Sequence, residues 1–201
     1  GRGRGRRRRG RGGGKGGLGP LGEPDTPRPA GSFGDKKGSN LGGTRLERLY
    51  LGANQSDCNI VMRLPKEKIV FVVDTLPVGQ VPGRGMIDFF PLETEAFVTK
   101  VIALDWERLI PGHPGAPNGR LGTKDDAKNV LALYQEASTE MKKLGQAGKC
   151  WDEAGKECKL PKYESIPGYA NGLPFVGRRT CGPAGRGPRA VRICRQAGVA
   201  S

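Results

Sequence analysis

The feature that most constrains this 201-residue chain is one apolar run, Ile69–Val73, which is followed directly by a carboxylate at Asp74. Five consecutive β-branched or aromatic residues are typical of a strand that is buried on both faces. Such a strand needs paired neighbours and a covering layer on each side. The run therefore predicts that the folded part of the chain is built around a β-sheet.

Two further strands are expected before this run. The segment TRLERLYL alternates apolar and polar side chains, which predicts a half-buried strand near 45–51. A second strand is expected near 58–64 after the turn-like GANQSD, and the sequence PKEK then predicts a hairpin turn into a strand at 69–74. Short links between all three strands predict an antiparallel meander.

Two helices are expected after the strands. The first spans about 94–104, with Thr94 as its N-cap and an apolar face that begins at Phe97. The second spans about 123–144, where Thr123 and Asp126 have capping-box spacing and Gly145 is a C-terminal stop. Residues 75–93 contain three prolines and three glycines and are expected to be mostly loop. The expected class is α/β (α+β), one sheet with outer helices.

The net charge of +14 comes almost entirely from the two ends of the chain. Residues 1–30 carry +7 and residues 176–201 carry +6, whereas the 145 residues between them have 19 basic and 18 acidic side chains. A balanced central region is a poor match to a basic DNA-binding domain. We expect a disordered Arg/Gly-rich tail at 1–43, a folded region at 44–175 and an irregular basic tail at 176–201.

Other classes of protein are also disfavoured. No stretch approaches the roughly 20 apolar residues of a membrane-spanning helix, and no secretory signal is recognisable, so no membrane partner is expected. The five cysteines are an odd number without a Cys-x-x-Cys pair, which is unlike a zinc ribbon or a disulfide framework. Cys58 is expected to be a small buried residue of a strand.

Two residues are candidates for chemistry on pattern alone. Asp74 ends the most apolar strand, and a carboxylate at a strand end either binds a cation or caps the following turn. His113, the only histidine, lies in the loop sequence Ile-Pro-Gly-His-Pro-Gly. It is either a ligand or a solvent-facing loop residue.

Several segments in order resemble the C-terminal half of the metallo-β-lactamase superfamily. They are YLGANQSDCNIVMRLPKEKIVFVVD, then DWERLIPGHPG, the helix TKDDAKNVLALYQEA, and the later Cys-Trp-Asp, Leu-Pro-Lys-Tyr and Arg-Arg-Thr-Cys segments. The resemblance covers about residues 41–175. It implies one sheet and the outer helices of a four-layer αββα sandwich whose metals lie at one edge.

The resemblance also implies roles for single residues. Asp74 takes the place of the carboxylate that bridges two zinc ions, and His113 that of a histidine ligand of the second zinc. Gln55 stands where the family has a histidine of the first zinc site, and a neutral amide is a weak zinc donor. The His-x-His-x-Asp-His motif of the N-terminal half is absent. The resemblance thus implies a truncated zinc hydrolase, inactive as this chain, with zinc bound weakly or not at all.

Alternatives to this interpretation concern the N-terminal tail and the missing half. The Arg/Gly tail is an RNA- or nucleic-acid-binding segment, a solvated polycation, or a GC-rich stretch translated out of frame, and the chain as a whole could be a partial gene product without function. If one face of the sheet is left uncovered, we expect a complementary half-domain or a homo-oligomer as partner. The nucleic-acid alternative rests on Arg2, Arg4, Arg6, Arg7, Arg8, Arg9 and Arg11.

Overall fold

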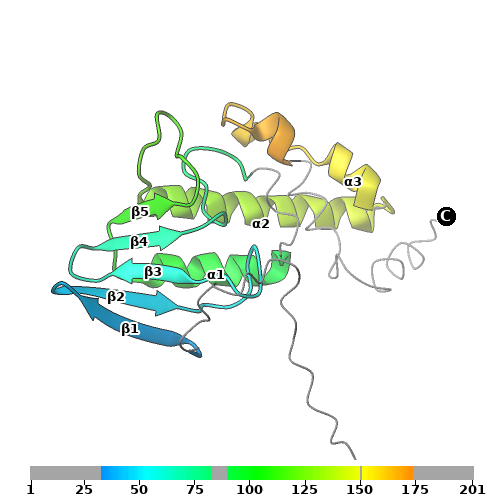
Figure 1. The fold of residues 1–201 in the computed structure, drawn as a ribbon. Helices are drawn as coiled ribbons and strands as arrows, with labels where there is room; N and C mark the ends of the chain where they lie inside the picture. The colour runs from blue at the N-terminus through cyan, green and yellow to red at the C-terminus, as the bar shows by residue number, and fades with distance from the viewer. Residues whose placement is uncertain (1–32, 83–89, 150, 174–201) are drawn as a thin grey trace, which may run out of the picture. The chain divides into compact units, whose positions relative to one another are not determined.

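The computed structural model describes residues 33–82, 90–149 and 151–173. They form an α+β fold with one five-stranded sheet and helices packed on it (Figure 1). The expected α+β class with one sheet and outer helices is confirmed. The arginines of the N-terminal tail and the predicted irregular segment at 176–201 lie outside the described residues.

The sheet has the strand order β1-β2-β3-β4-β5. The predicted meander is confirmed by β2 (Thr44–Leu49), β3 (Val61–Leu64) and β4 (Ile69–Val72), which pair antiparallel. The turn expected between β3 and β4 is present at Pro65–Lys68, where the Lys68 N–H donates to the Pro65 carbonyl. The strand β5 (Arg108–Pro111) pairs parallel to β4 and was not expected from the sequence.

The strand β1 (Lys36–Leu41) corrects the prediction that residues 1–43 are disordered. It pairs along its whole length with β2 across the turn at Gly42 and Gly43, whose φ angles of 56° and 81° suit glycine. At one end, the Lys36 ammonium lies 2.9 Å from the buried carboxylate of Glu47 and holds its pKa below the usual range. Backbone pairing and this ion pair order a strand with few apolar side chains.

Two helices lie on the same side of the sheet. The helix α1 (Pro91–Ala103) begins three residues before the predicted start, so Thr94 lies in its first turn, where its hydroxyl donates to the Phe90 carbonyl instead of capping. The helix α2 (Lys124–Gln146) has the predicted capping box of Thr123 and Asp126. It continues through the predicted stop at Gly145 and ends at Gln146, with Ala147 as its C-cap.

The chain after α2 returns along that helix. The helix α3 (Trp151–Glu157) and the 3-10 helix η2 (Pro161–Tyr163) follow, and buried Met141 of α2 packs with Ala154 and Cys158 in a small second cluster. Among the described helices, none combines the length and the apolar composition that crossing a membrane requires.

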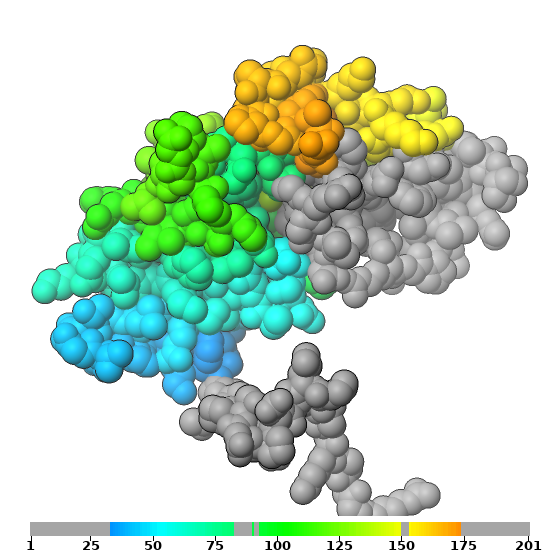
Figure 2. Space-filling model, turned by 45° about the horizontal axis from the view of Figure 1, so that its top comes forward, coloured from blue at the N-terminus to red at the C-terminus, as the bar shows by residue number. Residues whose placement is uncertain are grey.

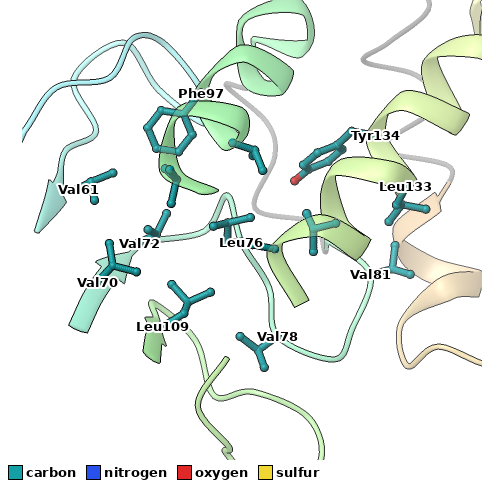
Figure 3. Close-up of a cluster of buried hydrophobic side chains, with 14 of the residues drawn as sticks. Val61, Val70, Val72, Leu76, Val78, Val81, Phe97, Leu109, Leu133 and Tyr134 are labelled. Carbon is teal, nitrogen blue, oxygen red and sulfur yellow. The ribbon is translucent and has the colours of Figure 1, made fainter. Parts of the chain in front are cut away.

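One face of the sheet forms the main core with α1 and α2. The central strands place Val61, Val70, Val72 and Leu109 on this face with 0% exposure, against Phe97 of α1 and Leu133 and Tyr134 of α2 (Figure 3). The strand register puts all four on one side, because partners across a ladder share a face. This confirms that the two predicted helices cover one face of the apolar run.

The opposite face carries no described helix (Figure 1). One cross-strand row on it consists of Lys37, Arg48, Met62, Phe71 and Ile110. Ile69, Phe71 and Val73 are half-buried, and Ile110 is 37% exposed. In Figure 2, the segments coloured blue, cyan and green lie next to one another at the surface of the molecule. The apolar run is therefore fully buried on one face only, which agrees with the expectation for a sheet whose second face is left uncovered. We call this second face the open face.

Candidate metal centre

Asp74 lies where β4 ends and the chain turns away from the sheet. Its φ is +60°, in the left-handed region, which is uncommon for a residue other than glycine. Its neighbours are held by hydrogen bonds. The Val73 carbonyl accepts from the Thr75 N–H at 2.6 Å and from Asn59 Nδ2 at 3.2 Å. These hydrogen bonds fix the backbone on both sides of Asp74, and so they fix the position from which its side chain extends.

His113 lies two residues beyond β5, the strand parallel to β4. The Gly112 N–H donates to the Val72 carbonyl at 3.2 Å, so the chain stays next to β4 for one more residue. A Cβ at position 112 would lie 2.9 Å from the Val73 Cα, closer than side chains tolerate. Glycine at 112 therefore allows the close approach that brings His113 beside Asp74.

The two predicted residues meet at this edge of the sheet. His113 Nε2 lies 2.6 Å from Asp74 Oδ1, with the imidazole 74% exposed and the carboxylate 23% exposed. This confirms the expectation that the two side chains approach each other at one edge. The contact has the distance of an ion pair without the direction of a hydrogen bond, so Oδ1 remains a buried acceptor without a hydrogen bond in the described chain.

Gln55 lies in the loop before β3 and is tied to the same turn. Its backbone N–H donates to Asn54 Oδ1 at 2.6 Å, and the Thr75 hydroxyl donates to the same oxygen at 2.9 Å. One buried amide therefore joins the loop at position 55 to the residue that follows Asp74.

Three residues of this region were not predicted as site residues. Asn54 and Thr75 are fully buried, and Tyr134 of α2 donates its hydroxyl to the Thr75 carbonyl at 3.0 Å. Burial raises the pKa of the Tyr134 hydroxyl, so this group stays a neutral donor. A buried amide in a polar loop has no sequence signal, since GANQSD looks like an ordinary turn.

Cys58 corrects a smaller expectation. It is exposed and lies before β3 begins at Val61, with its Sγ 3.7 Å from the Ser56 hydroxyl. It is therefore not a buried residue of a strand.

The donor set is small for a catalytic metal ion. Within the described ranges, no group of three or more His, Cys, Asp or Glu residues could hold a metal. Asp74 and His113 offer two donors, whereas catalytic zinc has three protein ligands and a water. Among the described residues, Asp74 and His113 are therefore two candidate metal donors, fewer than a catalytic zinc ion uses.

Comparison with known proteins gives structural matches only. No protein-family model and no curated protein sequence matches the chain. The inverting sec-alkylsulfatase Pisa1 from Pseudomonas sp. aligns over 75% of this chain and 25% of its own, with 15% identity and a TM-score of 0.58.

Two metallo-β-lactamases align over a shorter part of the chain. The enzyme from Pontibacter korlensis covers 52% of this chain and 47% of its own at 20% identity, with a TM-score of 0.46. The DIM-1 metallo-β-lactamase covers 52% and 47% at 21% identity, with a TM-score of 0.44. The chain thus spans between a quarter and about half of the length of these structures. The described chain has a partial metallo-β-lactamase fold.

Proposed function

We propose that this chain is the C-terminal half of a metallo-β-lactamase-fold, metal-dependent hydrolase, and that it does not hydrolyse substrates by itself. The observation that carries the proposal is the 2.6 Å approach of His113 Nε2 to Asp74 Oδ1 at the strand-end edge of the sheet. Two segments 39 positions apart, by residue number, place an imidazole and a carboxylate together, which is the donor chemistry that zinc takes.

The proposed role of this half is to supply part of a zinc centre. A bound zinc ion in such a centre makes a hydroxide available at neutral pH. Asp74 would hold the ion through a carboxylate oxygen that makes no hydrogen bond in the described chain, and His113 through Nε2. Gln55 is a third position whose amide is a poor donor. Further ligands must come from outside these residues.

The proposed partner is a complementary half-domain that covers the open face. Support comes from the half-buried apolar residues there and from the charges around them. The register places Lys37, Arg48 and Arg108 on the open face, and no Asp or Glu of the described strands. Two copies of the chain stacked through this face would bring cations toward cations, whereas a separate half-domain can bring carboxylates. A homo-oligomer is the competing outcome.

Zinc titration by calorimetry tests the metal proposal. We expect wild-type protein to bind zinc with a Kd weaker than roughly 1 µM, because two donors hold the ion poorly. Asp74→Asn and His113→Ala should each weaken binding by about tenfold or more. Glu140→Gln, which changes a partly exposed carboxylate of α2 that pairs with Lys143, serves as the matched control. Sub-micromolar binding by the wild type, or binding that survives both substitutions, would contradict the proposal.

The arginine-rich segment 1–17 lies outside the described residues, so no structural observation favours the nucleic-acid alternative. It stays a sequence prediction. Loss of a salt-dependent shift with single-stranded RNA on deletion of residues 1–17 would support it.

A further inference from the structure

We propose that Asn54 is a positioning residue that joins the two loops of the metal centre into one unit, with Thr75 and Tyr134 as its supports. This inference rests on the proposed function, since it concerns the geometry of the same zinc site. It adds that the backbone at position 55 is tied through Asn54 to the residue that follows Asp74, so we expect a better donor at 55 to strengthen metal binding.

The hydrogen bonds of Asn54 carry the first step. Its Oδ1 accepts from three donors, the Gln55 N–H at 2.6 Å, the Thr75 hydroxyl at 2.9 Å and Asn59 Nδ2 at 3.0 Å. Its Nδ2 donates to the Gly52 carbonyl at 3.1 Å. An oxygen that collects three donors from two loops fixes the distance between those loops.

The backbone of Asn54 is used as fully as its side chain. Its N–H donates to the Ser56 carbonyl at 3.0 Å, and its carbonyl accepts from the Phe90 N–H at 2.7 Å. The residue is 0% exposed. Asn54 therefore cannot turn away from the site without breaking bonds to both the loop and the segment that leads into α1.

Thr75 carries the second step, because it follows Asp74 directly. Its hydroxyl bonds to Asn54, and its carbonyl accepts the Tyr134 hydroxyl at 3.0 Å. On the other side of Asp74, the Val73 carbonyl accepts from Asn59 Nδ2 at 3.2 Å. The left-handed backbone of Asp74 therefore lies between two residues, Val73 and Thr75, that are both hydrogen-bonded. Their partners are Asn59, which itself bonds to Asn54, and Asn54.

This arrangement has a consequence for metal affinity. Partners that orient metal ligands through hydrogen bonds typically change affinity by about 10- to 100-fold when they are removed. The Thr75 hydroxyl lies one residue from Asp74 and bonds to the amide that also holds Gln55. Removing that hydroxyl should therefore weaken metal binding without touching any ligand.

Cobalt(II) titration followed by visible absorption tests the inference in the 201-residue chain that carries Gln55→His. Thr75→Val removes the hydroxyl at nearly constant shape, and Thr75→Ser keeps it. Tyr134→Phe removes the support on α2. Tyr169→Phe is the matched control, because it removes a phenol oxygen that accepts the Leu160 N–H at 2.8 Å, in another part of the molecule. Thermal unfolding of each variant is recorded in parallel.

We expect the Gln55→His variant to bind cobalt(II) more tightly than wild type. Adding Thr75→Val should weaken that binding by about 10-fold or more and change the absorption spectrum, while Thr75→Ser restores both. Tyr134→Phe should weaken it by a smaller factor, and Tyr169→Phe should leave affinity and spectrum unchanged. If the variant with Thr75→Val does not fold, the cobalt(II) affinities of the Tyr134→Phe and Tyr169→Phe variants are compared instead, and equal affinities would contradict the positioning role.

Two results would overturn the inference in distinguishable ways. If Gln55→His binds cobalt(II) tightly and the Thr75→Val and Tyr134→Phe substitutions lower only the unfolding temperature, the proposed centre stands and the positioning role is wrong. If Gln55→His binds no cobalt(II), the proposed metal centre is itself wrong, and the positioning role falls with it.

Discussion

The same strands form both faces of the sheet, but the described helices α1 and α2 cover only one of them. On the covered face, Val70, Val72 and Leu109 are completely buried by α1 and α2. On the open face, their immediate neighbours Ile69, Phe71 and Ile110 stay half-buried or exposed. Successive residues of a strand point to opposite sides, so a continuous apolar run serves two layers.

This difference explains where the stability of the chain comes from. Full burial of a Val or Leu side chain stabilises the fold by roughly 1.5–3 kcal/mol. Many such side chains are fully buried on the covered face, which packs against α1 and α2. The half-buried side chains of the open face contribute only part of this stabilisation. An apolar run with one covered face therefore indicates a fold that is stable through one layer and has a second layer available for a partner.

The sharpest test of the comparison uses two adjacent residues of β5. Leu109 is fully buried and Ile110 is 37% exposed. Leu109→Ala should lower the free energy of unfolding by about 2–5 kcal/mol, because it leaves a cavity against the helices. Ile110→Ala should cost less than about 1 kcal/mol. Urea unfolding of both variants measures this, and equal losses would show that both faces are buried alike.

A second test concerns the acid stability of the helix layer. Arg120 donates two hydrogen bonds to Asp126, at 2.6 and 2.9 Å, and the Thr123 N–H donates a third. The hydrogen bonds from Arg120 are the largest cause, and together with those from Thr123 they lower the pKa of Asp126 from 3.8 to about 2. Stability from this group is fully present above pH 3.8 and is lost as the pH falls toward 2.

Asp126→Asn should therefore lower the free energy of unfolding by about 1–2 kcal/mol at neutral pH, after allowance for the partly exposed Arg120. The variant should also flatten the pH dependence of stability between pH 4 and 2, roughly the range of the shift. Urea unfolding at several pH values measures both. Asp125→Asn, which changes an exposed neighbour that pairs with Lys128, is the control. The same acid profile in Asp126→Asn and wild type would refute the assignment.

The smallest expected effect on stability comes from the open face. Phe71→Thr with Ile110→Thr keeps strand-forming residues but removes apolar surface, so the free energy of unfolding should change by less than about 1 kcal/mol. Binding of a hydrophobic dye and self-association should both decrease. Dye fluorescence and sizing chromatography measure this. Wild-type protein that is monomeric and binds no dye would show that the open face needs no partner.

Local patterns determined a large part of this fold. Alternation in β2, the apolar run of β4 and the capping box of α2 all depend on residues near one another in sequence, and all three are present. The meander follows because its strands are joined by short links. The meeting of Asp74 and His113 was expected through a family resemblance, and the parallel pairing of β4 and β5 produces it.

Tertiary structure decided the remainder, because the partners are distant in sequence or weak in pattern. The strand β1 has little apolar content and is ordered by pairing with β2 and by the ion pair of Lys36 with Glu47. The bond from Thr75 to Asn54 spans 21 residues, and that from Tyr134 to Thr75 spans 59. No local periodicity encodes such contacts. Alternation along a strand says that it has two faces, and only the packing of α1 and α2 decides which one is covered.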